Sequence, residues 1–140
     1  MYKPVILKDK TTKSVIADFL RMAVFIDAKQ FSEDIKELNI TYDCEESKCF
    51  FEEIRDALNL LTKIDATSSV NEKGERVYDD TDIELTKEEA KSFSSYVDFA
   101  LFQVIRADDD INNPNWLYNI LAFQKICDGT KLNGLSEPRF

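Results

Sequence analysis

The stretch ESKCFFEEIRDALNLLT, residues 46–62, decides the fold class of this 140-residue chain. Its apolar side chains recur every three or four positions, and charged side chains fill the positions between them. The apolar set is Phe50, Phe51, Ile54, Ala57, Leu58 and Leu61, and the charged set is Lys48, Glu52, Glu53, Arg55 and Asp56. This period is typical of an amphipathic helix with one face on a core. The chain is therefore expected to be built from helices that share a core.

Upstream of this stretch, the same period predicts two more helices. Residues 13–27 carry apolar side chains at helical spacing, and Thr12 or Ser14 can cap the start of a helix there. Ser32 can cap a second, short helix. Residues 2–7 alternate weakly and contain a proline, so they are expected to form an edge strand or an extended arm.

Downstream, two further helices are predicted. Residues 87–106 are apolar around more than half of a helical circumference, which is typical of a helix packed on several sides. Residues 114–128 form the last helical pattern. Pro114 suits the first helical position, and Gly129 suits the position just beyond the end.

Between residues 63 and 85 the pattern changes from helix to hairpin. Residues 63–70 and 76–85 flank the turn sequence Asn71-Glu72-Lys73-Gly74. The second strand is expected to place apolar side chains on a covered face and polar ones on the other. The covered set is Val77, Ile83 and Leu85, and the outer set is Tyr78, Asp80, Asp82 and Glu84. We call residues 78–84 the acidic ribbon.

These elements predict a mainly α (α+β) fold, with four to five helices around one core and a small antiparallel β-hairpin. The length is that of one domain, residues 1–140, since single domains cluster near about 100–150 residues. Residues 130–140 are expected to form an irregular tail.

The charge of the chain is concentrated in its middle. Residues 41–110 carry eight basic and nineteen acidic side chains, whereas residues 1–40 and 111–140 are each close to neutral. The net charge is −9, and the basic residues are scattered. Direct nucleic-acid binding, which needs a basic patch, is therefore not expected. No apolar run is long enough to span a membrane, and a basic protein surface is the expected partner.

The composition also narrows the chemistry. The chain has no histidine, which excludes Ser-His-Asp and Cys-His nucleophile pairs and the usual zinc sites. Its three cysteines, Cys44, Cys49 and Cys127, form no C-x-x-C pair. They are expected to be reduced thiols in a cytoplasmic protein, and no signal peptide is recognised. No catalytic, cofactor-binding or metal-binding residue is predicted.

The acidic ribbon is the densest charge cluster and has three interpretations. It can be a solvated strand face that keeps the protein soluble. It can be a docking surface for lysine and arginine side chains of another protein. It can also supply carboxylates to a metal ion, although no further ligand set is visible. The residues assigned to partner binding are Tyr78, Asp79, Asp80, Asp82, Glu84 and Tyr96, with a tyrosine as aromatic anchor.

The aromatic residues of helix 87–106 leave a related alternative open. Tyr96, Phe99 and Phe102 lie off the core stripe of this helix. They can be core residues of a helix covered on two sides, or an exposed patch for a partner or a second copy of the chain. A homodimer would be consistent with both.

The segment Asp82-Ile-Glu-Leu-Thr-Lys-Glu-Glu-Ala90 leads a short acidic strand into a capped helix. Thr86 and Glu89 form a capping box. In this pattern, and in its size and acidity, the chain resembles small acidic bacteriophage accessory proteins. The resemblance covers about a fifth of the chain. It implies a host-directed or assembly-directed binding protein, located in the host cytoplasm, and assigns no functional residue.

We therefore expect a non-enzymatic, intracellular protein-binding module, of the kind that inhibits or modulates a larger complex through an acidic surface. One alternative is a homo-oligomeric structural or scaffold protein joined through residues 87–106. A further alternative is a metal-dependent enzyme that uses the clustered carboxylates of the acidic ribbon.

Overall fold

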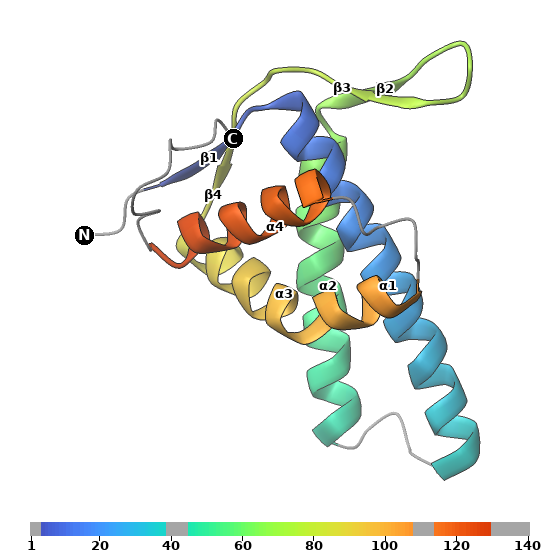
Figure 1. Ribbon diagram of the computed structural model, residues 1–140. Helices are drawn as coiled ribbons and strands as arrows, with labels where there is room; N and C mark the ends of the chain where they lie inside the picture. The colour runs from blue at the N-terminus through green and yellow to red at the C-terminus, as the bar shows by residue number, and fades with distance from the viewer. Residues whose placement is uncertain (1–3, 39–44, 108–113, 130–140) are drawn as a thin grey trace.

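Four helices and four short strands make up the part of the chain that the computed structural model describes, residues 4–38, 45–107 and 114–129 (Figure 1). In order they are β1 (Val5–Leu7), α1 (Lys10–Leu38), α2 (Glu45–Asp65), β2 (Ser68–Val70), β3 (Arg76–Tyr78), β4 (Ile83–Leu85), α3 (Lys87–Ala107) and α4 (Pro114–Cys127). The mainly α, α+β fold class is confirmed. The expected tail, residues 130–140, and Cys44 lie outside the described residues.

Helix α1 is longer than the sequence pattern predicts. It is one helix of 29 residues, whereas a helix over 13–27 and a separate one from Ser32 were expected. Residues 28–31 contain neither glycine nor proline, so nothing there ends the helix. The N-cap also differs, because Asp9 Oδ2 accepts hydrogen bonds from the backbone N–H of Thr12 at 2.9 Å and from its hydroxyl at 3.0 Å.

The strands form two separate sheets rather than one hairpin with a long second strand. β2 pairs with β3 across the predicted turn, and β4 pairs with β1, both antiparallel. Gly74, at φ +78°, supplies the left-handed position of the turn. Residues 79–82 belong to neither sheet, because Asp79 Oδ1 accepts the N–H of Thr81 and turns the chain.

This break reverses the expected faces at the β3 end of the predicted strand and leaves those at the β4 end unchanged. Val77, expected on the covered face, is exposed, and Tyr78, expected on the outer face, is buried. Ile83 and Leu85 are buried as predicted, and Glu84 points outward. The two ends of the predicted strand are β3 and β4, which pair with different strands. A single alternation of buried and exposed side chains therefore does not continue from one to the other.

The core lies around α1, which packs against the other three helices. Figure 1 shows α3 and α4 lying across the α1–α2 pair. The ring of Phe19 on α1 lies 6.3 Å from the rings of both Phe93 on α3 and Trp116 on α4, edge to face. Phe123 of α4 joins this group through Phe93, at 5.1 Å. Apolar burial at this centre stabilises the arrangement of the helices.

The buried face of α2 is turned relative to the predicted stripe. Leu60 and Ile64 are buried together with Ala57, whereas Phe51 and Leu58 are exposed at the edge of the stripe. The buried face is rotated because α2 packs against both α1 and α3, so the buried residues lie between those two helices. The outer edge of the predicted stripe, with Phe51 and Leu58, is therefore exposed.

Helices α3 and α4 follow their predicted patterns. The core stripe of α3 is buried at Ala90, Phe93, Val97, Ala100 and Val104. Its capping box is present: the Thr86 N–H donates to Glu89 Oε1, and the Glu89 N–H donates to Thr86 Oγ1. Helix α4 starts at Pro114, as predicted.

The C-terminal end of α4 also follows the sequence pattern. Gly129 follows α4 with φ +76°, and Cys127 at its end is a buried free thiol, which fits a small apolar side chain.

Within residues 4–38, 45–107 and 114–129, no helix combines the length and apolarity that crossing a membrane requires.

Candidate functional site

The backbone of the acidic ribbon binds a buried lysine. Lys13 of α1 is fully buried, and its Nζ donates to the carbonyl oxygens of Asp79 at 2.9 Å and Thr81 at 2.6 Å. It also donates to Thr67 Oγ1 at 3.1 Å, and it lies 3.8 Å from the Asp79 carboxylate. Lys13 therefore joins α1 to both ends of the segment between β3 and β4.

The charge of the ribbon balances that of Lys13. Burial lowers the pKa of Lys13, and the nearby charges of Asp79, Asp80 and Asp82 act in the opposite direction. Asp82 also lies 3.9 Å from the exposed amine of Lys8. Two of the four ribbon carboxylates, Asp79 and Asp82, therefore lie within 4 Å of a lysine of the same chain.

The two tyrosines assigned as aromatic anchors lie inside the fold, which corrects the outer-face position expected for Tyr78 and, of the two alternatives left open for Tyr96, places it in the core. The Tyr78 hydroxyl donates to Asp65 Oδ1 at 2.7 Å and accepts from Arg21 Nη2 at 3.0 Å. Arg21 in turn holds both oxygens of Asp65, at 2.6 and 2.7 Å. Burial raises the pKa of Tyr78, so it stays a neutral donor. This triad connects α1, α2 and β3.

Tyr96 on α3 is 5% exposed, and its hydroxyl donates to Asp27 Oδ2 of α1 at 2.8 Å. Burial, followed by the hydrogen bond to Asp27, raises the pKa of Tyr96. One edge of this side chain lines a groove between α2 and α3, which connects it to a different surface from the acidic ribbon.

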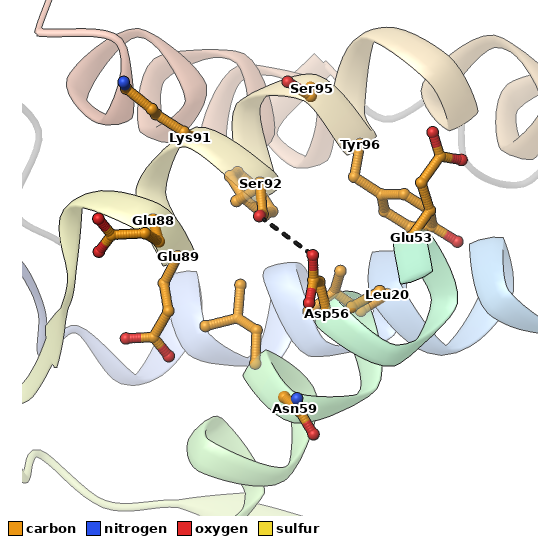
Figure 2. Close-up of a pocket in the computed structure, with 13 residues that line it drawn as sticks. Leu20, Glu53, Asp56, Asn59, Glu88, Glu89, Lys91, Ser92, Ser95 and Tyr96 are labelled. Carbon is orange, nitrogen blue, oxygen red and sulfur yellow. Dashed lines mark hydrogen bonds between the residues drawn. The ribbon is translucent and has the colours of Figure 1, made fainter. Parts of the chain in front are cut away.

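That groove encloses about 410 Å³ and has an apolar floor with polar rims (Figure 2). Its floor consists of Leu20, Ala57, Leu60, Phe93 and Tyr96. Its rims carry Glu53, Asp56 and Asn59 from α2, and Glu88, Glu89, Lys91, Ser92 and Ser95 from α3. The Ser92 hydroxyl approaches Asp56 Oδ2 across the groove at 3.5 Å.

At one end of the groove, which we call the Glu89 end, the acidic charge is neutralised. Lys63 Nζ lies 2.9 Å from Glu89 Oε1 and donates to the carbonyl oxygen of Glu84. Burial raises the pKa of Glu89, but the hydrogen bond from Thr86 and the ammonium of Lys63 outweigh burial and lower it overall. Lys91 adds a second cation at this end, as Figure 2 shows.

At the other end, which we call the Tyr96 end, Glu53 lies on the rim, and the buried Asp27 accepts the Tyr96 hydroxyl without lining the groove itself. Burial raises the pKa of Asp27, and the Tyr96 hydrogen bond offsets part of this rise. Burial, and then the charge of Asp27, raise the pKa of Glu53. Of the described residues, no lysine or arginine forms an ion pair with either carboxylate.

The helical spacing in the sequence places the residues of each rim on one face of its helix, but it does not show that the two rims lie opposite each other. Glu53 and Asp56 are three positions apart on α2, and Glu88, Ser92 and Ser95 follow helical spacing on α3. The α2 row lies on the polar face opposite the predicted core stripe, and no role was predicted for the α3 row. Only the packing of α2 on α3 brings the two rows together over an apolar floor.

Within the described ranges, no three acidic or cysteine side chains lie close enough together to hold a metal ion. Comparisons of the chain with protein-family models, with curated proteins and with solved structures find no match.

Proposed function

We propose that this protein is a non-enzymatic binding module that takes a basic, amphipathic helical segment of a partner protein into the α2–α3 groove. The observation that carries the proposal is the combination of an apolar floor with carboxylates on both rims. A helix with one apolar stripe between two rows of cationic side chains complements that combination. Burial of the stripe would supply affinity, and the charges would supply orientation and association rate.

The proposed mechanism is steric occlusion of the segment that the partner needs for its own assembly. This mechanism is that of an inhibitor or modulator of a larger complex, as the resemblance to bacteriophage accessory proteins suggested. The site differs from the one proposed on sequence alone, because the acidic ribbon balances Lys13 and its tyrosine is buried. We keep a cytoplasmic location as part of the proposal.

The test compares two charge-reversal variants that change the net charge equally. The groove variant carries Glu53→Lys, Asp56→Lys and Glu88→Lys, and the ribbon variant carries Asp80→Lys, Asp82→Lys and Glu84→Lys. All six side chains are exposed, and because Asp80 and Asp82 act on the buried charge of Lys13, thermal unfolding of each variant checks that it is folded before binding is measured. Asp79 is left unchanged because it pairs with Lys13.

The probe is a synthetic helical peptide with a leucine stripe flanked by arginines, which we call the Arg–Leu peptide. The groove variant should bind it at least about tenfold more weakly, a loss of about 1.4 kcal/mol, and the ribbon variant should retain most of the affinity. Calorimetric titration at two salt concentrations measures both. Equal losses would indicate unspecific attraction to an acidic protein, and a larger loss in the ribbon variant would move the site to residues 78–84.

A second candidate function, homo-oligomeric assembly, is favoured by the outer face of α3. Phe99 is 49% exposed and Phe102 is 67% exposed, with the Arg106 guanidinium 5.7 Å from the centre of the Phe102 ring. Adjacent exposed aromatics are typical of a contact surface. Sedimentation at micromolar concentration distinguishes the candidates: a dimer that Phe102→Ser dissociates supports assembly, and a monomer supports the binding module.

A further inference from the structure

We propose that residues 130–140, which we call the C-terminal segment, bind in the α2–α3 groove of their own chain and compete there with the partner. The regulatory role of this contact rests on the proposed function, because it concerns the same surface. The segment has the sequence TKLNGLSEPRF and lies outside the described residues. Its chemistry is known from this sequence, and its starting point is known from the position of Gly129.

The end of α4 is held against the first half of α3 (Figure 1). The hydroxyl of Ser94 on α3 donates a hydrogen bond to the Asp128 carboxylate. Gln124 Nε2 donates to the carbonyl oxygen of Ser94 at 3.0 Å and to Asp98 Oδ1 at 2.7 Å. Gly129 follows Asp128 directly and is exposed. The C-terminal segment therefore begins beside α3, the helix that forms one rim of the groove.

The groove lies within reach of this starting point. Ser95, the residue after Ser94, and Lys91 both line the groove and are exposed. The side of α3 that meets α4 and the side that forms the rim are therefore neighbouring faces of one helix, whose diameter is about 10–12 Å. Eleven extended residues span about 36 Å. The segment is long enough to pass around α3 and to lie along the rim from Glu88 to Tyr96, which is about 12 Å long.

The side chains of the C-terminal segment complement the groove. Three of them, Leu132, Leu135 and Phe140, are large and apolar, as the floor of the groove is. The segment also carries two basic residues, Lys131 and Arg139, against one acid, whereas the lining of the groove carries four acidic side chains and one lysine. Apolar burial would hold the segment, and the opposite charges would favour its approach.

A segment attached beside its site needs little affinity to occupy it. A short connection raises the effective concentration of the segment at the groove to the millimolar range. With a dissociation constant of about 1 mM, the segment therefore occupies about half of the grooves. The apparent affinity of a partner falls in proportion to the fraction of grooves that are empty. The contact would thus restrict binding to partners that displace the segment.

The test uses two variants of the 140-residue chain and the Arg–Leu peptide. The segment variant carries Leu132→Ser, Leu135→Ser and Phe140→Ser. The control variant carries Asn133→Ser and Ser136→Asn, which exchange two polar residues of the same segment. Calorimetric titration measures the affinity for the peptide, and the amide signals in NMR spectra report on the groove. Leu135→Ser alone replaces the segment variant if thermal unfolding shows that the triple substitution disturbs the fold.

We expect the segment variant to bind the peptide at least about threefold more tightly than the wild type, and the control variant to match the wild type. The amide signals of Asn59, Ser92 and Ser95 should shift in the segment variant, whereas those of Asp80 and Asp82 in the acidic ribbon should not. Groove signals that do not move would overturn the contact, whether or not the peptide binds. Equal affinities of wild type and segment variant would overturn the competition.

Two further outcomes separate the contact from the proposed function. A synthetic peptide of residues 130–140, added to the segment variant at millimolar concentration, should return the groove signals toward their wild-type positions and weaken binding of the Arg–Leu peptide. If it leaves both unchanged, the contact is overturned while groove binding stands. If the Arg–Leu peptide binds to none of the three proteins while the groove signals move as expected, the proposed function is overturned and the contact stands.

Discussion

The acidic ribbon and the Tyr96 end of the groove carry the same kind of charge in opposite circumstances. In the ribbon, the exposed carboxylate of Asp79 lies 3.8 Å from the buried ammonium of Lys13, and that of Asp82 lies 3.9 Å from Lys8. At the Tyr96 end, the buried Asp27 and its neighbour Glu53 have no cation beside them among the described residues. The two regions therefore differ in burial as well as in pairing: the ribbon carboxylates are exposed and two of them lie near a lysine, whereas Asp27 is buried and has no neighbouring cation in the described part of the chain.

The largest expected effect comes from removing the cation under the ribbon. Lys13→Met leaves the carbonyl oxygens of Asp79 and Thr81 without their buried donor, and should lower the free energy of unfolding by about 3–5 kcal/mol. Urea denaturation measures this loss. Lys10→Met, at an exposed position, is the control and should change stability by less than about 0.5 kcal/mol. A similar, small effect of both substitutions would show that Lys13 does not hold the ribbon.

A pair of tyrosine substitutions compares the two buried hydroxyls. Tyr96→Phe removes the donor of a buried carboxylate that has no cation beside it in the described part of the chain, and should cost about 2 kcal/mol. Tyr78→Phe should cost about 1 kcal/mol, because Asp65 keeps its two hydrogen bonds from Arg21. Thermal and chemical unfolding of both variants gives the order. The reverse order would contradict the view that the Tyr96 end is the less compensated of the two.

Asp27→Asn should stabilise the free protein at pH 7 by about 1 kcal/mol, because it removes a buried charge and can keep the acceptor for Tyr96. The pKa of Asp27 is raised in the folded state, so ionisation costs stability at neutral pH. This cost falls as the pH drops through the raised folded value and is gone below the unfolded value near about 3.9. Unfolding curves between pH 3 and 7 should show the advantage of the variant disappearing over this range. A variant less stable than wild type at pH 7 would contradict it.

The smallest effect, with the opposite sign, is expected for Asp79→Asn in the ribbon. The pKa of Asp79 is lowered, first by hydrogen bonds from Thr81, so its ionised form stabilises the folded state. The variant should therefore be slightly less stable than wild type at pH 7. The difference should fade as the pH falls below the unfolded value through the lowered folded value. The same unfolding series measures it, and an increase in stability at pH 7 would remove the contrast with Asp27.

Several features of the fold follow from local patterns. The limits of α3 and α4, the capping box at Thr86 and Glu89, and the turn at Gly74 were all predicted. The errors arose where a partner distant in sequence decided the outcome. Tyr78 points inward, where its hydroxyl donates to Asp65 and accepts from Arg21. The buried face of α2 is rotated from the predicted stripe because α1 and α3 both pack against this helix.

The sequence by itself determined the helical class, the caps and turns, and the concentration of charge in residues 41–110. These depend on spacing and chemistry within a few residues, which periodicity and capping rules describe. Only the tertiary structure decided which of those charges are compensated. Lys13 meets Asp79, and Asp27 meets Tyr96, across more than sixty residues of chain, and α2 meets α3 over the groove floor. Compensation of charge acts over a few ångströms in space, so it is set by packing and not by distance along the chain.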